Sequence, residues 1–239
     1  MNIDYVKTPF TNNPSMTRLE GPAYNHNPNE RYLAEKYKQL DLYGEKLYGE
    51  TKISKEESLR EKFLKFCNLD NALSLIEITT RLEEDFAIMH KGKMELVSVC
   101  FPSGWIPKDK LGKHLSAIHE PIADSEQLIR ASDKLSDYMT KQSIKRWVWT
   151  ITTSKNLSEY PDFEKPEVSI FENLYFRVET QTTAPIDNLT SIFFIKVDVL
   201  PLAEAWDIRI LESINSMTEE VLDYKNLRQI KELLNRMEV

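Results

Sequence analysis

Apolar residues recur at two different spacings along this chain, and the spacing divides it into helical and extended regions. Before residue 80, at residues 125–139 and after residue 200 the spacing is helical. Ser54 and Glu57 have the separation of a capping box, with Leu59, Phe63 and Phe66 on one face of the helix that follows. The predicted helices cover residues 29–47, 54–66, 71–80, 125–139, 202–214 and 218–237.

Between these groups the apolar residues alternate with a period of two, which is typical of strands. The segment KGK at 91–93 separates two such runs and predicts a hairpin turn. Five strands in hairpin or meander order, with helices before and after them, indicate an α+β fold with an antiparallel sheet. The predicted strands cover residues 86–90, 97–101, 145–153, 173–181 and 190–199.

The distribution of structure predicts one main domain and an N-terminal arm. Residues 1–28 contain several prolines and asparagines without a period, so we expect an extended arm there. Residues 29–239 have a length that suits a single domain. No apolar run is long enough to cross a membrane and no secretory signal is seen, which predicts a cytoplasmic protein that does not enter a membrane.

Composition excludes several classes of function. Acidic residues outnumber basic ones by 38 to 31, which argues against a general nucleic-acid binder. The two cysteines are too few for a four-thiolate zinc or iron–sulfur site. No two glycines form a GxG pair, so neither the dinucleotide fingerprint nor a phosphate-binding glycine loop is present.

Histidine and cysteine side chains are candidates for chemical roles. Cys100 falls in a strand pattern and is expected to be a buried structural thiol. His119 lies among apolar residues two positions before Pro121, where we expect a non-helical backbone. It is either a core histidine or the single axial ligand of a haem iron, for which one imidazole nitrogen is sufficient.

The strand at 174–180 places Tyr175, Arg177 and Glu179 on one face. They are either a solvent-exposed face with an Arg–Glu pair or a polar patch facing a pocket. In a pocket, Arg177 could donate to bound oxygen or a haem propionate, and Glu179 could hold an amine. On both interpretations the loss of Arg177 is expected to leave thermal stability nearly intact.

Three tryptophans are candidates for the wall of a flat pocket. Trp147 and Trp149 share a face of their predicted strand, and Trp105 lies in a proline-flanked loop. They either line a cofactor or pack in the core.

Several stretches taken together resemble the haem-dependent oxidative N-demethylase alpha-subunit family. The resemblance spans about residues 84–200, and the order and spacing of its motifs are specific. Thr180 stands where the family has a second arginine, and Ala123 where it has a second proline after the histidine. The stretches are EDFAIM (84–89), VCFPSGWIPKDKLGKHLSAIHEPI (99–122), KRWVWTI (145–151) and LYFRVETQT (174–182).

The resemblance implies a PAS-like haem-binding fold and O2-dependent removal of a methyl group from a small secondary amine. It implies haem iron as cofactor, with His119 as the axial ligand. Arg177 and Glu179 match a catalytic stretch, and Trp105, Trp147, Trp149 and Tyr175 are candidates for contacts to the cofactor. Electrons would come from external flavin and iron–sulfur reductase partners.

Two alternatives remain open at this stage. One is a haem-binding sensor or carrier of the same fold, which needs His119 but no electron partner. The other is a haem-free interaction module in which His119 is a core residue.

Overall fold

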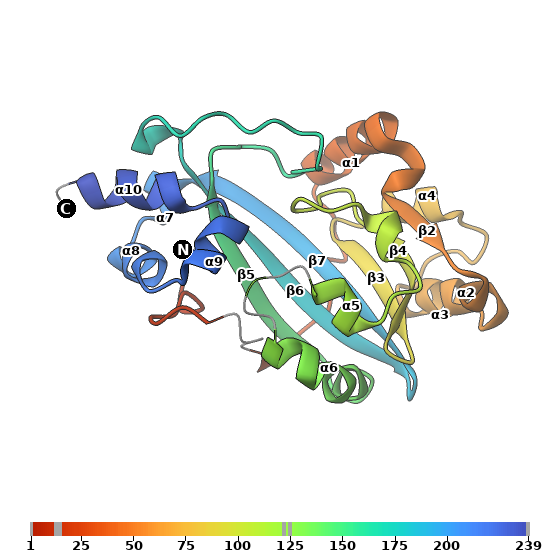
Figure 1. Ribbon diagram of the computed structural model, residues 1–239. Helices are drawn as coiled ribbons and strands as arrows, with labels where there is room; N and C mark the ends of the chain where they lie inside the picture. The colour runs from red at the N-terminus through yellow and green to blue at the C-terminus, as the bar shows by residue number, and fades with distance from the viewer. Residues whose placement is uncertain (1, 12–15, 121–122, 124–125, 238–239) are drawn as a thin grey trace.

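The chain builds one antiparallel sheet with helices on both of its faces (Figure 1). The computed structural model describes residues 2–11, 16–120, 123 and 126–237. Within these residues the strand order is β1-β5-β6-β7-β3-β4-β2, and every neighbouring pair is antiparallel. The strands are β1 (Thr17–Arg18), β2 (Tyr48–Glu50), β3 (Asp85–His90), β4 (Lys93–Ser98), β5 (Ile144–Thr152), β6 (Tyr175–Asp187) and β7 (Thr190–Pro201).

The α+β class is confirmed, but the expected five-stranded PAS-like sheet is wrong. The sheet has seven strands in the described residues, because β1 pairs with β5 at one edge and β2 pairs with β4 at the other. Strands of two and three residues are too short to show an alternating pattern. The turn at 91–93 is confirmed, with Lys91 and Gly92 both at positive φ between β3 and β4.

Helices precede and follow the sheet, as the apolar pattern predicts. The capping box expected at Ser54 and Glu57 is wrong, because Thr51 caps the helix there. A capping box forms instead at Ser74 and Glu77. The α-helices are α1 (Glu30–Tyr43), α2 (Lys52–Glu56), α3 (Leu59–Phe66), α4 (Leu75–Thr79), α5 (Leu115–His119), α6 (Glu126–Met139), α7 (Leu202–Ala205), α8 (Ile208–Asn215), α9 (Glu219–Tyr224) and α10 (Arg228–Arg236).

The two faces of the sheet are covered by different helices. Phe176 and Val178 of β6 pack in an apolar cluster with α7, α8, α9 and α10, and Phe86 of β3 packs in a second cluster with α3 and α4. On the opposite face, Ala87 and Val97 pack with α5 and α6. Figure 1 shows α5 and α6 in front of the sheet and α8 and α9 beside β5.

The described parts of the N-terminal arm pack against the rest of the chain. Ile3 and Val6 are buried in the cluster formed by the C-terminal helices. The Ser213 hydroxyl donates a hydrogen bond of 2.7 Å to the Lys7 carbonyl. Residues 2–11 therefore complete the core beneath α8, while the division into an arm of residues 1–28 and a domain of 29–239 stays a prediction.

A buried ion pair joins α1 to the start of β3. Lys36 Nζ lies 3.2 Å from Asp85 Oδ1, and both side chains are fully buried. Lys36 also donates to the Glu84 carbonyl at 2.6 Å, and Asp85 accepts from the Phe101 backbone N–H at 2.8 Å. Because the charges are desolvated, the pair is costly to break from one side. The ion pair fixes the start of the 101–104 loop, because the Phe101 N–H binds Asp85.

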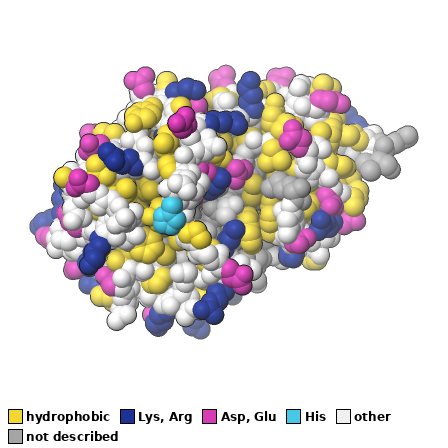
Figure 2. Space-filling view, turned by 180° about the vertical axis from the view of Figure 1, so that it is seen from behind, with side chains coloured by type: hydrophobic (Ala, Val, Ile, Leu, Met, Phe, Trp, Pro, Cys, Tyr) yellow, Lys and Arg dark blue, Asp and Glu magenta, His cyan; other side chains and the backbone are white. Residues whose placement is uncertain are grey.

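Figure 2 shows the face opposite the view of Figure 1, on which basic and acidic side chains are interspersed. A continuous basic patch, which phosphate-backbone binding requires, is not seen on this face. Across the described residues, no helix combines the length and apolar character needed to cross a bilayer.

Candidate functional site

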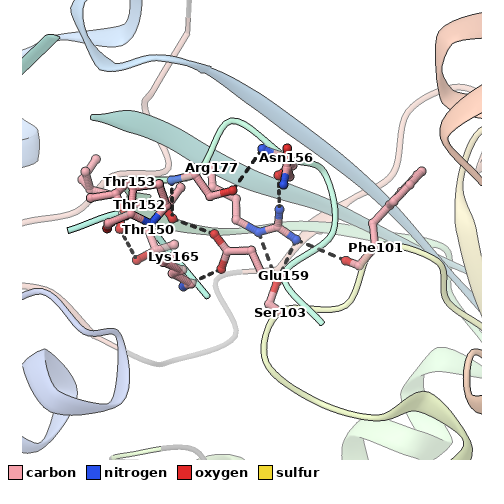
Figure 3. Close-up of polar contacts among 12 residues, drawn as sticks. Phe101, Ser103, Thr150, Thr152, Thr153, Asn156, Glu159, Lys165 and Arg177 are labelled. Carbon is pink, nitrogen blue, oxygen red and sulfur yellow. Dashed lines mark hydrogen bonds and ion pairs between the residues drawn. The ribbon is translucent and has the colours of Figure 1, made fainter. Parts of the chain in front are cut away.

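Arg177 lies inside the protein, not on an exposed face. Its side chain is 2% exposed. One terminal nitrogen donates to the Leu157 carbonyl at 2.6 Å and to the Asn156 carbonyl at 3.4 Å, and the other donates to the Phe101 carbonyl at 3.1 Å. Figure 3 shows the guanidinium held between the 101–104 loop and residues 156–157. Arg177 thus fastens two loops to β6.

Ser103 connects Arg177 to Glu179. Its hydroxyl accepts from Arg177 Nε at 3.2 Å and from a terminal nitrogen at 3.0 Å, and it donates to Glu179 Oε1 at 2.5 Å. A hydroxyl has one proton to donate and two lone pairs, so Ser103 is fully used. The Arg–Glu pair considered from the sequence is therefore bridged by a residue of the FPSG motif.

The polar chain continues from β6 to β5. Gln181 Nε2 donates to Glu179 Oε2 at 2.8 Å, and Gln181 Oε1 accepts from Arg146 Nε at 2.8 Å. The sheet register places Arg146 directly opposite Gln181, so the contact follows from strand pairing. Four side chains of β5 and β6 and one loop serine thus form a continuous network that ends at Arg146.

His119 is the last residue of α5, so the non-helical backbone expected before Pro121 is wrong. Its Nδ1 lies 2.8 Å from the Leu115 carbonyl oxygen. A carbonyl can only accept, so the proton is on Nδ1 and the lone pair is on Nε2. Burial, with Arg146 and Lys110 nearby, lowers the His119 pKa to about 4, which keeps the imidazole neutral near pH 7.

His119 and Arg146 lie within electrostatic range of each other. Both are only partly exposed, and burial is the largest cause of the pKa decrease of each. Arg146 acts electrostatically on His119, and Glu179 acts on Arg146. This part of the fold therefore brings together a neutral imidazole, a guanidinium and the end of the polar network.

The structure separates the three tryptophans. Trp105 packs in the apolar cluster that contains Leu115 and Ile118 of α5, on the side of His119. Trp147 and Trp149 point to the other face of the sheet, where Trp147 stacks on Tyr5 and Trp149 packs with Phe176. The strand register agrees, because Trp149 is opposite Val178 and not opposite Arg177. Of the three, Trp105 is the one that packs near α5 and His119.

Tyr175 lies at the start of β6. It lines an open cleft of about 380 Å³ formed mainly by the loop after β5, with Thr153, Asn156 and Phe163 among its other residues. His119, Arg146 and Glu179 do not line that cleft. Beside it, the buried Glu159 carboxylate binds Lys165 at 2.6 Å and the Thr152 hydroxyl at 2.6 Å (Figure 3). This interaction ties the loop to the end of β5.

Sequence reasoning missed Ser103, Arg146 and Gln181. The signal for Ser103 was its place in the FPSG motif, which from the sequence alone is only part of a loop. The signal for Gln181 was its spacing of two residues from Glu179, and the signal for Arg146 was its place on the face of β5 opposite to Trp147 and Trp149. Bringing the two residues together required the register of β5 on β6. Cys100 is buried as expected. His90 is buried as well, at 3% exposure.

The motifs that carried the resemblance thus meet in one part of the fold. Asp85, the 101–104 loop, His119, Arg146 and Arg177 are joined by hydrogen bonds or lie on the same side of the sheet. Residues 31–235 match the family described as haem-dependent oxidative N-demethylase, alpha subunit-like. The match covers most of the 239 residues, and the chain belongs to this family.

Proposed function

We propose that this chain binds haem and that His119 Nε2 is the axial ligand of its iron. The observation that carries the proposal is the hydrogen bond from His119 Nδ1 to the Leu115 carbonyl. This bond holds the ring in the tautomer whose Nε2 can coordinate, as is common for metal-binding histidines. The low pKa of His119 means that no proton has to be displaced near neutral pH.

The surroundings of His119 support a haem more than a small polar ligand. Ile118 and Trp105 belong to one apolar cluster, which can cover a flat hydrophobic ring system. Arg146 offers positive charge within electrostatic range of His119. Haem supplies oxidative chemistry that side chains cannot perform, while the protein supplies the ligand, the pocket shape and the electrostatics.

We further propose the activity that the family description suggests, the O2-dependent oxidative N-demethylation of a small amine. Within the chain, Glu179 is the acceptor assigned to the ammonium group, because it is the carboxylate of the network and can accept more hydrogen bonds than the two it receives from Ser103 and Gln181. Both cysteines are buried and too few for an iron–sulfur cluster. Turnover therefore requires an external reductase, with flavin and iron–sulfur groups as its electron carriers.

The ligand assignment is tested by absorption spectra of the protein reconstituted with haem. Wild type is expected to show a Soret band, and His119→Ala is expected to lose or shift it. His114→Ala is the matched control, because His114 caps α5 through Ser116 and is a neighbour on the same helix. Added imidazole should restore a histidine-like spectrum to His119→Ala. An unchanged spectrum in that variant would falsify His119 as the ligand.

A second function, haem transport or sensing without turnover, is favoured by one observation. Every hydrogen-bond donor group of Arg177 is occupied by protein acceptors, so Arg177 has no donor left for a reacting group. Oxygen consumption and formaldehyde release with a reductase and a small secondary amine distinguish the two functions. A haem-loaded chain that remains silent with every competent reductase supports the carrier.

A further inference from the structure

Arg146 is an incompletely paired cation near His119. Its Nε donates to Gln181, but no partner of its two terminal nitrogens is found in the part of the chain that the structure describes. The nearest acid, Glu179, is already bonded by Ser103 and Gln181. A guanidinium presents a fork of N–H groups that matches a carboxylate, and one that is desolvated without an anion is costly.

Among the described residues, Glu179 is the charged group that acts electrostatically on Arg146, and both of its carboxylate oxygens already accept hydrogen bonds, from Ser103 and Gln181. Arg146 and Lys110 both act on His119, so two cations lie near its imidazole although the whole chain carries a net charge of −7. An anion is therefore the complementary ligand on this side of Arg146.

We propose that Arg146 binds a carboxylate on the side of its guanidinium that lies near His119. The inference rests on the proposed function for the identity of the ligand, because the carboxylate can come from two sources. One is a propionate of haem, and the other is the acid group of an N-methylated amino acid. In both cases the terminal nitrogens of Arg146 form a bidentate contact, while Gln181 holds Nε and fixes the plane of the guanidinium.

The experiment compares haem with its dimethyl ester, which has no free carboxylate. Apo-protein is titrated with each, and the Soret absorbance gives the dissociation constants. If the ligand is a propionate, Arg146→Gln should weaken the binding of haem by about tenfold or more and leave the binding of the ester unchanged. Arg146→Lys, which keeps the charge and loses the fork, should fall between them.

Lys145→Gln is the matched control. It removes one positive charge from the adjacent position of β5, where the Lys145 ammonium lies over the Trp147 ring on the other side of the strand. It should bind haem and its ester as wild type does. An equal weakening in Lys145→Gln would show that net charge, and not Arg146, is responsible, and the proposal would be overturned.

If haem affinity is unchanged in Arg146→Gln, the haem-loaded protein is titrated with N-methylglycine and with dimethylamine. A spectral response to N-methylglycine that disappears in Arg146→Gln, while the response to dimethylamine remains, assigns the carboxylate to the substrate. Identical responses in wild type and Arg146→Gln, together with identical affinities for haem, overturn the proposal.

One readout does not depend on haem. Replacing chloride with acetate at constant ionic strength should raise the Tm of wild-type apo-protein more than that of Arg146→Gln, since a ligand of the native state stabilises it. Should wild type fail to bind haem, the proposed function fails, and this comparison still decides whether Arg146 binds carboxylates. Equal Tm increases in that case overturn the inference.

Discussion

Ser103 Oγ lies 3.0 Å from a terminal nitrogen of Arg177 and 3.2 Å from its Nε, so a single hydroxyl accepts from two nitrogens on one edge of the guanidinium. The contact joins a loop residue to a strand residue 74 positions away. It shows that the FPSG motif and the RVE motif are parts of one structural unit. The same guanidinium also binds backbone carbonyls, which gives Arg177 a structural role that its strand position alone did not indicate.

Replacing Arg177 tests that role. Arg177→Leu leaves the carbonyls of Phe101 and Leu157 and the Ser103 hydroxyl without their donor, so we expect a loss of about 3–5 kcal/mol in the free energy of unfolding. Urea unfolding followed by circular dichroism measures it. The expectation from the sequence alone, that thermal stability stays nearly intact, is thereby reversed.

The control for this prediction is Arg130→Leu. Arg130 is an exposed helix residue paired with Glu126 at 3.3 Å, and we expect its loss to change stability by less than about 0.5 kcal/mol. If both variants unfold at the same urea concentration, the hydrogen bonds of Arg177 contribute little to the fold.

The buried ion pair gives a second prediction. Lys36→Met leaves the Asp85 carboxylate uncompensated in the interior, which should cost about 3–5 kcal/mol of stability. Adding Asp85→Asn removes the stranded charge, so the double variant should be more stable than Lys36→Met. Lys38→Met, at an exposed lysine of the same helix, is the control and should be nearly neutral. A double variant no better than the single one would contradict the explanation by an unpaired charge.

The separation of the tryptophans gives a third prediction. Trp149 is 5% exposed and packs with Phe176 beneath the C-terminal helices. Trp149→Leu should therefore cost about 2–4 kcal/mol of stability and leave the spectrum of bound haem unchanged. Trp105→Leu should shift the Soret band or weaken haem binding, because Trp105 packs beside α5. Absorption spectra and urea unfolding of both variants check the assignment, and the reverse pattern would refute it.

Lys225 gives a prediction about pH. Burial lowers its pKa from the ordinary 10.5 to about 8, and Glu179 opposes the shift. Between these two pH values the unfolded chain binds more protons at this position than the native chain does, so stability rises with pH. Relative to Lys225→Met, wild type should gain on the order of 1 kcal/mol across that interval, after allowance for the partial exposure of the ammonium. The gain is absent below the folded-state pKa.

Chemical denaturation of wild type and Lys225→Met at both ends of the interval measures this difference. The Lys225 ammonium donates to the Trp149 carbonyl at 2.9 Å, and this bond is retained by a neutral amine. A constant difference between the two proteins across the interval would show that Lys225 titrates normally.

The long elements of the fold were predictable because their patterns are strong. The five long strands alternate clearly, and the turn KGK separates two of them. Pattern could not reveal β1 and β2, which are only two and three residues long. Nor could it reveal that His90, which directly precedes the turn, is buried between β4 and β7, where its Nδ1 lies 2.8 Å from the Thr190 hydroxyl oxygen.

Predicting the site from the sequence was limited by one missing piece of information, the face of each strand that is covered. Period-two spacing groups Arg177 with Glu179, and Trp147 with Trp149, and the structure shows both groupings. The spacing does not indicate which of the two groups lies on the face of the sheet that α5 and α6 cover. Nor does it indicate that Arg146 lies opposite Gln181, which depends on the register between two strands that are separated by a long loop.

The contacts between residues 2–11 and α8 have a consequence for synthesis of the chain. Phe10 and Ser216, like Lys7 and Ser213, are 206 positions apart and are joined by hydrogen bonds. During translation residues 2–11 emerge long before their partners in α8, so Ile3 and Val6 have no core to enter until the helices from α8 onward have been made. Such distant contacts also slow folding in general. The apolar side chains of residues 2–11 are therefore exposed in the nascent chain throughout that interval, when they form a binding site for a chaperone that recognises short apolar sequences.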